Sequence, residues 1–379
     1  MTETAGRPAP AQLPYERRAQ VVELLRRRGV VRANDLAAEL DVSVITIRRD
    51  IALLASRGVV RRVRGGAVLS GGAPAGDGER ERHAVPEATG TAVRQVTVGV
   101  VVPSLTYYWP DVIRGVREAA TPSSARVVLR GATYQAEDER RQLSWLVESM
   151  EVDGLLVAPT TTGEEGEALV RWLQAADLPV VLLERAAAVG PYREAMESVV
   201  SDHALGAAMA VRHLATLGHR RVGVLTAAQS PTTQHVRRGW RQACEELGLA
   251  LEGTPDVSPA GHGEATRAAV LDGVLDACLA SGTTAMLVHS DPEAMSLVER
   301  CQVRGVRVPG DLSLVAYDDE VAELCDPPLT AVRPPKAAVG RAAFELLAAR
   351  LADRDAQRPA HRVVIAPRLM VRSSSSAPR

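Results

Sequence analysis

Arginines and short polar side chains follow a helical spacing in residues 43–57, just before Gly58. Ser43 can cap the first turn of this helix, because its hydroxyl can accept a hydrogen bond from an unpaired backbone amide. Ile47, Ile51 and Leu54 recur at spacings of four and three, which marks one buried face. Another face can read base edges and phosphates in the major groove of DNA, and it carries Val44, Thr46, Arg48 and Arg49.

Two further helices and a hairpin surround this segment. Residues 15–28 and 34–40 have helical apolar patterns, and residues 41–43 predict the tight turn of a helix-turn-helix. Residues 59–63 and 67–68 predict a short hairpin. Gly65 and Gly66 between the strands permit close approach to a phosphate. The sequence therefore predicts a winged helix-turn-helix domain.

This segment resembles the DNA-binding domain of DeoR-type transcriptional regulators. The resemblance covers about 55 residues and rests on the turn at 42–43, the Thr-Ile-Arg-Arg-Asp core at 46–50 and the Arg-Gly-Gly-Ala wing end at 64–67. It implies operator contacts by Ser43, Thr46, Arg48 and Arg49, and contacts to the flanking DNA backbone by Arg61, Arg62 and Arg64. The alternative is a three-helix unit whose arginine-rich face is merely solvated.

Charge separates this segment from the rest of the chain. Residues 15–68 contain 12 Arg and 6 Asp or Glu, a net charge of +6, whereas the whole chain carries −1 and residues 69–379 carry −7. Only the N-terminal part should attract double-stranded DNA. We therefore expect the acidic remainder to bind something other than nucleic acid.

Composition limits the class of protein. With 379 residues, of which 46% are apolar, the chain can form several domains with cores. No apolar run approaches the roughly 20 residues that span a bilayer, and residues 1–8 lack a hydrophobic signal core. We expect a cytoplasmic protein without membrane contact. Cys244, Cys278, Cys301 and Cys325 are isolated, so no zinc or redox motif is predicted and no cofactor is expected.

Low-complexity segments suggest the domain boundaries. Residues 70–95 are rich in Gly, Ala, Pro and charge and predict a flexible linker, and residues 373–379 predict a loose tail. We expect a disordered N-terminus at 1–14, the winged helix at 15–69 and a second domain at 96–372.

Strand and helix patterns alternate in the second domain. Strands are predicted at 96–103, 126–129, 154–158, 179–183, 221–225, 285–289 and 312–316. Helices are predicted at 110–120, 137–150, 166–176, 203–217, 235–247, 266–280 and 292–304. Continuous Val and Leu runs joined by helices indicate parallel sheets covered on both faces, and two series indicate two lobes. Ligands of such α/β folds bind at the carboxyl ends of the strands.

Residues 96–372 resemble the effector-binding domain of the LacI/GalR family, which is similar to periplasmic sugar-binding proteins. The resemblance rests on five segments, namely 152–156, 179–185, 214–223, 308–319 and 327–330. It implies a two-lobed, type I periplasmic-binding-protein-like domain, with lobe 1 at about 96–200 and 320–350 and lobe 2 at about 201–319 and 360–372. The chain departs from the family at the connection, where a DeoR-type head and a loose linker replace the family's own helix-turn-helix and hinge helix.

Three adjacent aromatic residues follow the first predicted strand of this domain. Only 3% of the chain is aromatic, yet Tyr107, Tyr108 and Trp109 stand together where the loop should face the cleft. Aromatic rings stack on the C–H faces of sugars, and their polar atoms add hydrogen bonds. The resemblance implies ligand contacts by Tyr108 and Trp109, with plugging of the lobe as the alternative.

Three charged residues end other predicted strands. Asp318 can accept hydrogen bonds from adjacent sugar hydroxyls, or it is a solvated or hinge residue. Asp291 follows the strand at 285–289, beside Ser290, where the family often has a ligand-binding asparagine, so the resemblance implies a ligand contact by Asp291. The alternative is that Asp291 caps the helix that opens at Pro292, and both roles are compatible. Arg185 can donate in a fork to hydroxyls or a ring oxygen, or it forms a plain salt bridge.

The resemblance also implies a ligand contact by Thr232. Val236 stands where the family commonly has a ligand-binding arginine, which leaves the ligand's identity open. Gln234 and His235 are candidate substitutes.

We predict a sugar-responsive transcription factor, a repressor, that binds double-stranded operator DNA as a homodimer and a small sugar or polyol between its lobes. The chain lacks a Walker-type phosphate loop, a Gly-x-Ser-x-Gly elbow and a His-Glu-x-x-His motif, so no enzyme is predicted. The alternative is a DNA-binding protein whose lobes serve only for dimerisation. A transport protein is disfavoured by the basic head, and a phosphosugar-isomerase-like body by the tandem lobes.

Overall fold

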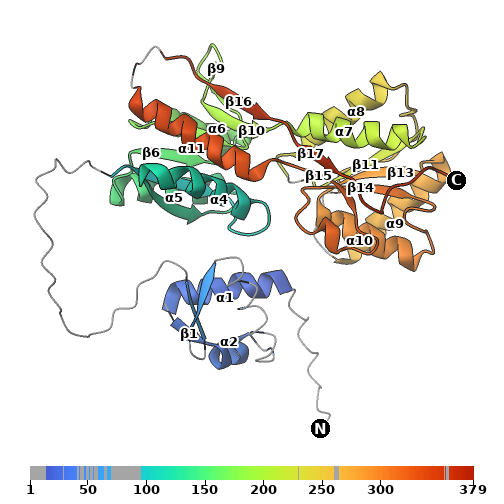
Figure 1. Ribbon diagram of the computed structural model, residues 1–379, viewed down its shortest axis with the longest axis horizontal. Helices are drawn as coiled ribbons and strands as arrows, with labels where there is room; N and C mark the ends of the chain where they lie inside the picture. Colours follow the sequence, from blue (N-terminus) through green and yellow to red (C-terminus); the bar gives the residue numbers. More distant parts are fainter. Residues whose placement is uncertain are drawn as a thin grey trace, which may run out of the picture. The chain divides into compact units, whose positions relative to one another are not determined.

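A computed structural model describes the chain at residues 14–28, 30–40, 42, 47, 51, 54, 59–63, 66–69, 95–228, 230–259, 264–353, 355 and 358–379. The chain divides into two compact units, residues 1–91 and residues 92–379 (Figure 1).

The first unit combines helices with a small antiparallel sheet. Its elements are α1 (Pro14–Arg28), β1 (Val30–Arg32), α2 (Ala33–Glu39), β2 (Val60–Val63) and β3 (Gly66–Leu69). The strand order is β1-β3-β2, so the predicted hairpin is confirmed and gains β1 as a third strand. Ile47, Ile51 and Leu54 are helical and at most 5% exposed, which confirms the predicted buried stripe.

Lobe 1 of the second unit is a six-stranded parallel sheet with order β16-β10-β7-β6-β4-β5. Its strands are β4 (Thr97–Val102), β5 (Arg126–Gly131), β6 (Gly154–Val157), β7 (Val180–Leu183), β10 (Ser198–Ser201) and β16 (Arg362–Ile365). Helices α4 (Trp109–Ala120) and α11 (Lys336–Ala352) pack on one face, and α5 (Ala136–Ser149) and α6 (Gly163–Gln174) pack on the other. A small hairpin, β8 (Ala188–Val189) and β9 (Glu194–Ala195), projects after β7.

Lobe 2 repeats this plan with strand order β12-β11-β13-β14-β15-β17. Its strands are β11 (Val222–Thr226), β12 (Asp256–Val257), β13 (Ala285–His289), β14 (Ser313–Tyr317), β15 (Thr330–Arg333) and β17 (Arg368–Met370). All pairs are parallel except β15 with β17. Helices α7 (His203–Thr216) and α8 (Thr233–Glu246) cover one face, and α9 (Glu264–Ser281) and α10 (Asp291–Val303) cover the other. The predicted α/β class with parallel sheets in two lobes is confirmed.

The chain passes between the lobes three times, from β10 to α7, from β15 to α11 and from β16 to β17 (Figure 1). The expected assignment of 320–350 to lobe 1 and 360–372 to lobe 2 is therefore wrong at two strands. β15 pairs with β14 in lobe 2, and β16 pairs with β10 in lobe 1. The residues of a strand as short as β15 or β16 do not show which sheet it joins, because tertiary packing determines the neighbouring strand.

The segment after β17 packs against lobe 2. Ser374 is fully buried, and its hydroxyl donates to the Leu314 carbonyl at 2.6 Å and accepts from the Thr330 amide at 2.8 Å. The prediction of a loose tail at residues 373–379 is wrong. The Ser374 hydroxyl forms hydrogen bonds with backbone groups at the amino ends of β14 and β15, and composition does not reveal this role.

Ser374→Ala should lower the free energy of unfolding by about 1–3 kcal/mol, because it leaves a buried amide and a buried carbonyl without partners. Ser373→Ala is the matched control, since the Ser373 side chain is exposed, and it should change stability by less than about 0.5 kcal/mol. Urea unfolding of the full chain measures both. Equal, small effects would mean that the serine segment does not stabilise lobe 2.

Candidate functional site

Most residues predicted to contact DNA lie outside the part of the chain that the structure describes, namely Ser43, Val44, Thr46, Arg48, Arg49 and Arg64. Arg61 and Arg62 belong to β2 and pair with Val68 and Ala67 of β3. The DNA contacts of all eight residues therefore stay a prediction.

The predicted ligand residues stand at strand ends that face the junction of the lobes. They follow β4 and β7 in lobe 1 and β13 and β14 in lobe 2, and they are Tyr108, Trp109, Arg185, Asp291 and Asp318. Hydrogen bonds join the two sides directly: the Tyr107 hydroxyl from lobe 1 donates to Asp318 Oδ2 of lobe 2 at 3.2 Å, and Lys336 Nζ from lobe 1 donates to the Asp318 carbonyl at 2.6 Å.

A buried carboxylate, Glu184, organises the lobe 1 side. Its oxygens accept hydrogen bonds from the Tyr108 hydroxyl at 2.6 Å and from the hydroxyl and amide of Ser201 at 2.7 and 2.8 Å. Nε2 of His203 lies 3.6 Å from the second carboxylate oxygen. Burial alone would raise the pKa of Glu184, but His203 and these hydrogen bonds hold it at about 2. Glu184 therefore fixes Tyr108 in place rather than offering a vacant acceptor.

Three neighbouring rings in tilted and edge-to-face arrangements continue this network into lobe 2. Tyr317 is fully buried, and its hydroxyl donates to the His203 carbonyl at 3.1 Å. The ring centroids of His203 and His289 lie 5.8 and 5.5 Å from that of Tyr317. Burial lowers the pKa of His289, and its Nδ1 atom has no hydrogen-bond partner among the residues that the structure describes. His289 is therefore a neutral ring with unused hydrogen-bonding capacity at the lobe junction.

Asp291 is fully buried and holds the loop that follows Asp318. Its carboxylate accepts hydrogen bonds from the amides of Asp319, Glu320 and Val321 at 3.2, 2.6 and 3.0 Å. Burial, partly offset by these amides, and the charge of Asp318 raise the pKa of Asp291 to about 7. The alternative that Asp291 caps the helix opening at Pro292 is wrong, because α10 begins at Asp291 itself and the carboxylate serves the neighbouring loop.

Asp318 is the lobe 2 carboxylate that faces lobe 1. Its backbone has a φ of 98° and its side chain is 7% exposed. The Asp318 carbonyl accepts a hydrogen bond from Lys336 Nζ at 2.6 Å. Nε2 of His289 lies 3.9 Å from Oδ2, which is too far for a hydrogen bond. Within the described residues, Oδ1 has no hydrogen-bond partner, so this carboxylate can accept from a ligand.

Arg185 and Trp109 lie near each other on the lobe 1 side of the candidate site. Arg185 NH1 donates to the Glu184 carbonyl at 2.8 Å, and its guanidinium lies 6.0 Å from the centre of the Trp109 ring. Arg185 forms no ion pair with the described carboxylates, so the salt-bridge alternative is not realised. Trp109 is 3% exposed and packs in the core of lobe 1, which matches the alternative of a plug.

The third group of predicted residues opens α8. Thr232 precedes the helix, Gln234 is exposed and His235 is half-buried. Burial and the charge of Arg238 lower the pKa of His235, and Arg185 contributes to the same shift.

Val236 is fully buried in the core of lobe 2. The position therefore supplies packing and no hydrogen-bond donor.

Sequence reasoning singled out Tyr107 only as one of three adjacent aromatic residues, and it did not select six other residues of this network, namely Glu184, Ser201, His203, His289, Tyr317 and Lys336. The rule that sites gather at carboxyl strand ends could have found most of them, since Ser201, His289 and Tyr317 end their strands and Glu184 follows one. Lys336 is the only lysine of the chain, which was a second signal.

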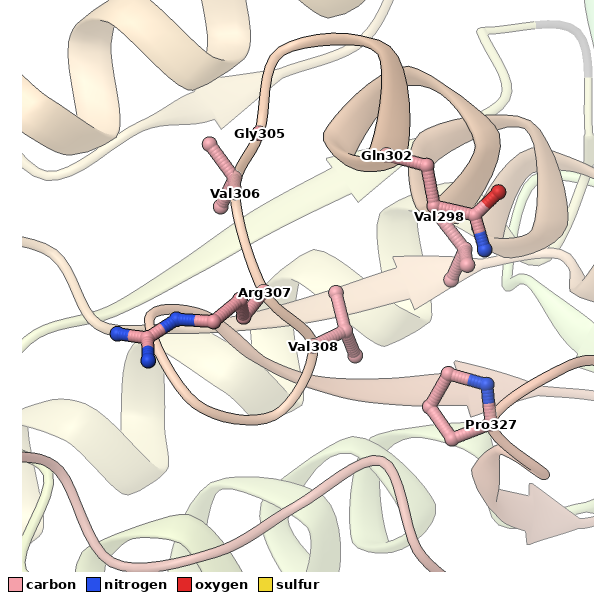
Figure 2. A pocket seen from close by; sticks show the side chains of 7 residues that line it. All are labelled: Val298, Gln302, Gly305, Val306, Arg307, Val308 and Pro327. Atoms are coloured by element: carbon pink, nitrogen blue, oxygen red, sulfur yellow. The ribbon is translucent and has the colours of Figure 1, made fainter.

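A separate surface cavity of about 360 Å³ lies at the amino end of the lobe 2 sheet (Figure 2). It is lined by Val298, Gln302, Gly305, Val306, Arg307, Val308 and Pro327. The α10 terminus and the loop before β14 form its wall, so it is distant from the carboxyl strand ends that hold the candidate site.

Two findings bear on other classes of protein. No cluster of three or more His, Cys, Asp or Glu side chains in the described ranges could hold a metal ion. No helix in the same ranges is long and apolar enough to cross a membrane.

Comparisons with known proteins match both units. Residues 17–71 match the DeoR-like helix-turn-helix domain, and residues 211–375 match the periplasmic binding protein-like domain. A relative from Vibrio atlanticus, the HTH-type transcriptional repressor PurR, is 28% identical over 263 residues, which are 68% of this chain and 75% of the relative.

Two solved structures are similar to this chain in fold. A LacI family transcriptional regulator from Mycobacterium smegmatis is 26% identical, with a TM-score of 0.59 over 74% of this chain and all of the other. The transcriptional regulator CelR in complex with cellobiose is 24% identical, with a TM-score of 0.63 over 88% of this chain and 90% of the other.

Glu184→Gln should destabilise the protein in a pH-dependent manner. The pKa of Glu184 is held at about 2, below its ordinary value of 4.5, so its stabilising contribution is present above about pH 4.5 and is lost as the pH falls towards 2. The variant should be less stable than the parent by on the order of 3 kcal/mol near neutral pH, and the difference should shrink towards about pH 3.

Urea unfolding at several pH values measures this difference. Glu345→Gln is the control, because Glu345 is exposed on α11. A difference that stays constant with pH would contradict the assigned role of Glu184.

Proposed function

We propose, for a transcription regulator that joins a DeoR-like helix-turn-helix domain to a LacI-type periplasmic-binding-protein-like body, that a small sugar or polyol controls its hold on operator DNA. The effector would bind between the two lobes. Residues 15–69 would form the DNA-binding head and residues 96–372 the effector-binding body. The protein would act as a homodimer on a two-fold operator.

The proposal depends on hydrogen-bonding groups that stand at the carboxyl ends of strands in both lobes. Arg185 at the end of β7 has donors that no described carboxylate engages, and Asp318 at the end of β14 has an oxygen without a described partner. A polyol both donates and accepts hydrogen bonds through each hydroxyl. It can therefore accept from the guanidinium and donate to the carboxylate at once, which would hold the lobes closed.

Closure would reach the DNA through the three chain crossings. A ligand that contacts both lobes binds the closed arrangement better than any open one, so it shifts the population towards closure. Because β10, β15 and β16 all lead into the opposite lobe, a rotation of one lobe displaces the surface that the homodimer would share. A coupling of about 1–3 kcal/mol would change operator affinity about 5- to 150-fold.

The effector should alter DNA binding measurably. A duplex enriched from a random pool by the full-length protein would be titrated with and without ribose, glucose, cellobiose and other sugars. At least one sugar should change the dissociation constant by about fivefold or more. Replacement of both Arg48 and Arg49 by alanine should abolish binding to this duplex at physiological salt. An unchanged affinity with every sugar would favour a body that serves only for dimerisation.

Arg185→Ala and Asp318→Asn should each remove the response to the effector while leaving DNA binding intact. An active sugar at about 100 times its dissociation constant should stabilise the parent by about 2.7 kcal/mol, which a thermal shift detects. Arg117→Ala is the control for loss of an arginine, since Arg117 is exposed on α4. Retention of the full shift in both site variants would place the ligand elsewhere.

A further inference from the structure

Tyr107 extends from lobe 1 to a carboxylate of lobe 2. It lies in the loop between β4 and α4, and its backbone has a φ of 61°, in the left-handed region that bulky residues rarely adopt. Its hydroxyl donates to Asp318 Oδ2 at 3.2 Å. A residue other than glycine keeps such a backbone conformation only when the surrounding contacts hold it. The hydrogen bond to the opposite lobe is one of these contacts.

The charged groups that face the Tyr107 hydroxyl belong to lobe 2. Burial raises the pKa of Tyr107. Three carboxylates add to this rise, namely those of Asp318, Asp291 and Glu320, and a hydrogen bond with Ser290 opposes it. The phenol therefore stays protonated and can donate to a carboxylate at any pH near neutrality. A hydrogen bond to a charged acceptor is stronger than one between two neutral groups.

Lys336 lies between the two lobes at the same place. It is the first residue of α11, which packs on lobe 1, and its ammonium lies 5.4 Å from the centre of the Tyr108 ring. On the lobe 2 side it donates to the Asp318 carbonyl at 2.6 Å and to a carboxylate oxygen of Glu320. Groups of both lobes therefore cover this amine, and its side chain is only 5% exposed. Separation of the lobes should expose it to solvent.

We propose that the hydrogen bond between Tyr107 and Asp318 is a latch by which the protein's own side chains hold the lobes together. The Asp318 side chain is 7% exposed, so a solute reaches its second oxygen when the lobes separate. Loss of one hydrogen bond to a charged group should make this separation about ten times more frequent. The latch concerns the body alone, whereas its consequence for an effector rests on the proposed function.

The latch should delay the entry and the exit of an effector equally. Tyr107 donates to Oδ2 of Asp318, and a ligand hydroxyl can donate to Oδ1 at the same time. The latch is therefore present with and without an effector, and it must open for passage in either direction. A residue that contacts the ligand itself would instead change the dissociation constant.

Lys336 reports the state of the latch without any ligand, because it is the only lysine of the chain. Reductive methylation of the folded, full-length protein with formaldehyde and cyanoborohydride, followed by peptide mass spectrometry, measures how often this amine is exposed. Tyr107→Phe keeps the ring and removes the donor, so it should raise the methylation rate of Lys336 about tenfold. Tyr192→Phe is the matched control, because Tyr192 is 86% exposed, and it should leave the rate unchanged.

Ser374→Ala distinguishes opening of the junction from unfolding. It weakens lobe 2 at the amino end of β14, whereas Asp318 follows the carboxyl end of that strand. It should therefore leave the methylation of Lys336 unchanged in the absence of denaturant. Equal rates in Tyr107→Phe and the parent overturn the inference. An increase of the same size in Ser374→Ala also overturns it, since unfolding would then expose the amine.

An Asp318→Asn background tests whether the two residues act as a pair. The acceptor is neutral in this background, so Tyr107→Phe should accelerate methylation less than it does in the parent. The same acceleration in both backgrounds would mean that Tyr107 acts through some other contact, and the latch would be wrong.

Stopped-flow mixing with ribose, glucose or cellobiose measures the consequence for an effector. For a sugar that binds, Tyr107→Phe should raise the association and dissociation rate constants together about tenfold, with a nearly unchanged dissociation constant. A change in the dissociation rate constant alone contradicts the proposed delay, because Tyr107 would then contact the ligand. If methylation shows the latch but none of these sugars binds, the latch stands and the sugar effector of the proposed function fails.

Discussion

A carboxylate removed from water must receive hydrogen bonds from the protein, and this requirement shapes the junction between the lobes. Glu184 meets it within lobe 1 and at the crossing into lobe 2, through Ser201, Tyr108 and His203. Asp291 meets it through three amides of one loop. Within the described part of the chain, Asp318 meets it through a hydrogen bond from the Tyr107 hydroxyl of the opposite lobe. The arrangement of the lobes is thus tied to how one carboxylate is satisfied.

The three carboxylates have different consequences. Glu184 and Asp291 are saturated by groups close to them in the fold, so they fix local geometry whatever the lobes do. Asp318 draws on Tyr107 for its side chain and on Lys336 for its carbonyl, and both of those residues belong to lobe 1. A change in the hydrogen-bond donors to Asp318 therefore alters contacts across the junction, whereas protonation of Asp291 acts on the 319–321 loop.

Much of the fold could be predicted from the sequence, because its signals are local. The strands at 97–102 and 285–289 are buried on both faces, and their sequences are largely continuous apolar runs. The buried stripe of Ile47, Ile51 and Leu54 follows from helical spacing alone. The sequence does not show which sheet the strand at 330–333 or the strand at 362–365 joins, because each pairs with a strand far away in the chain.

The candidate site was predictable only in part, for a related reason. Asp318 and Arg185 end strands, and a rule about strand ends finds them. The role of Tyr107 depends on a backbone turn and on a partner in the other lobe, and neither is written in the residues beside it. Serine hydroxyls such as that of Ser374 suit solvent and buried backbone equally, so composition misassigned the segment at 373–379.

The position of β16, β17 and Ser374 has a consequence for biosynthesis. These late segments complete the sheets of both lobes, so lobe 1 cannot reach its final form until residue 365, and lobe 2 until residue 374, has emerged from the ribosome. The described strands of the first unit end at residue 69, so this unit can fold much earlier during translation. The nascent body must keep its Val- and Leu-rich strands from aggregating over some 300 residues of synthesis, which makes it a natural client for chaperones.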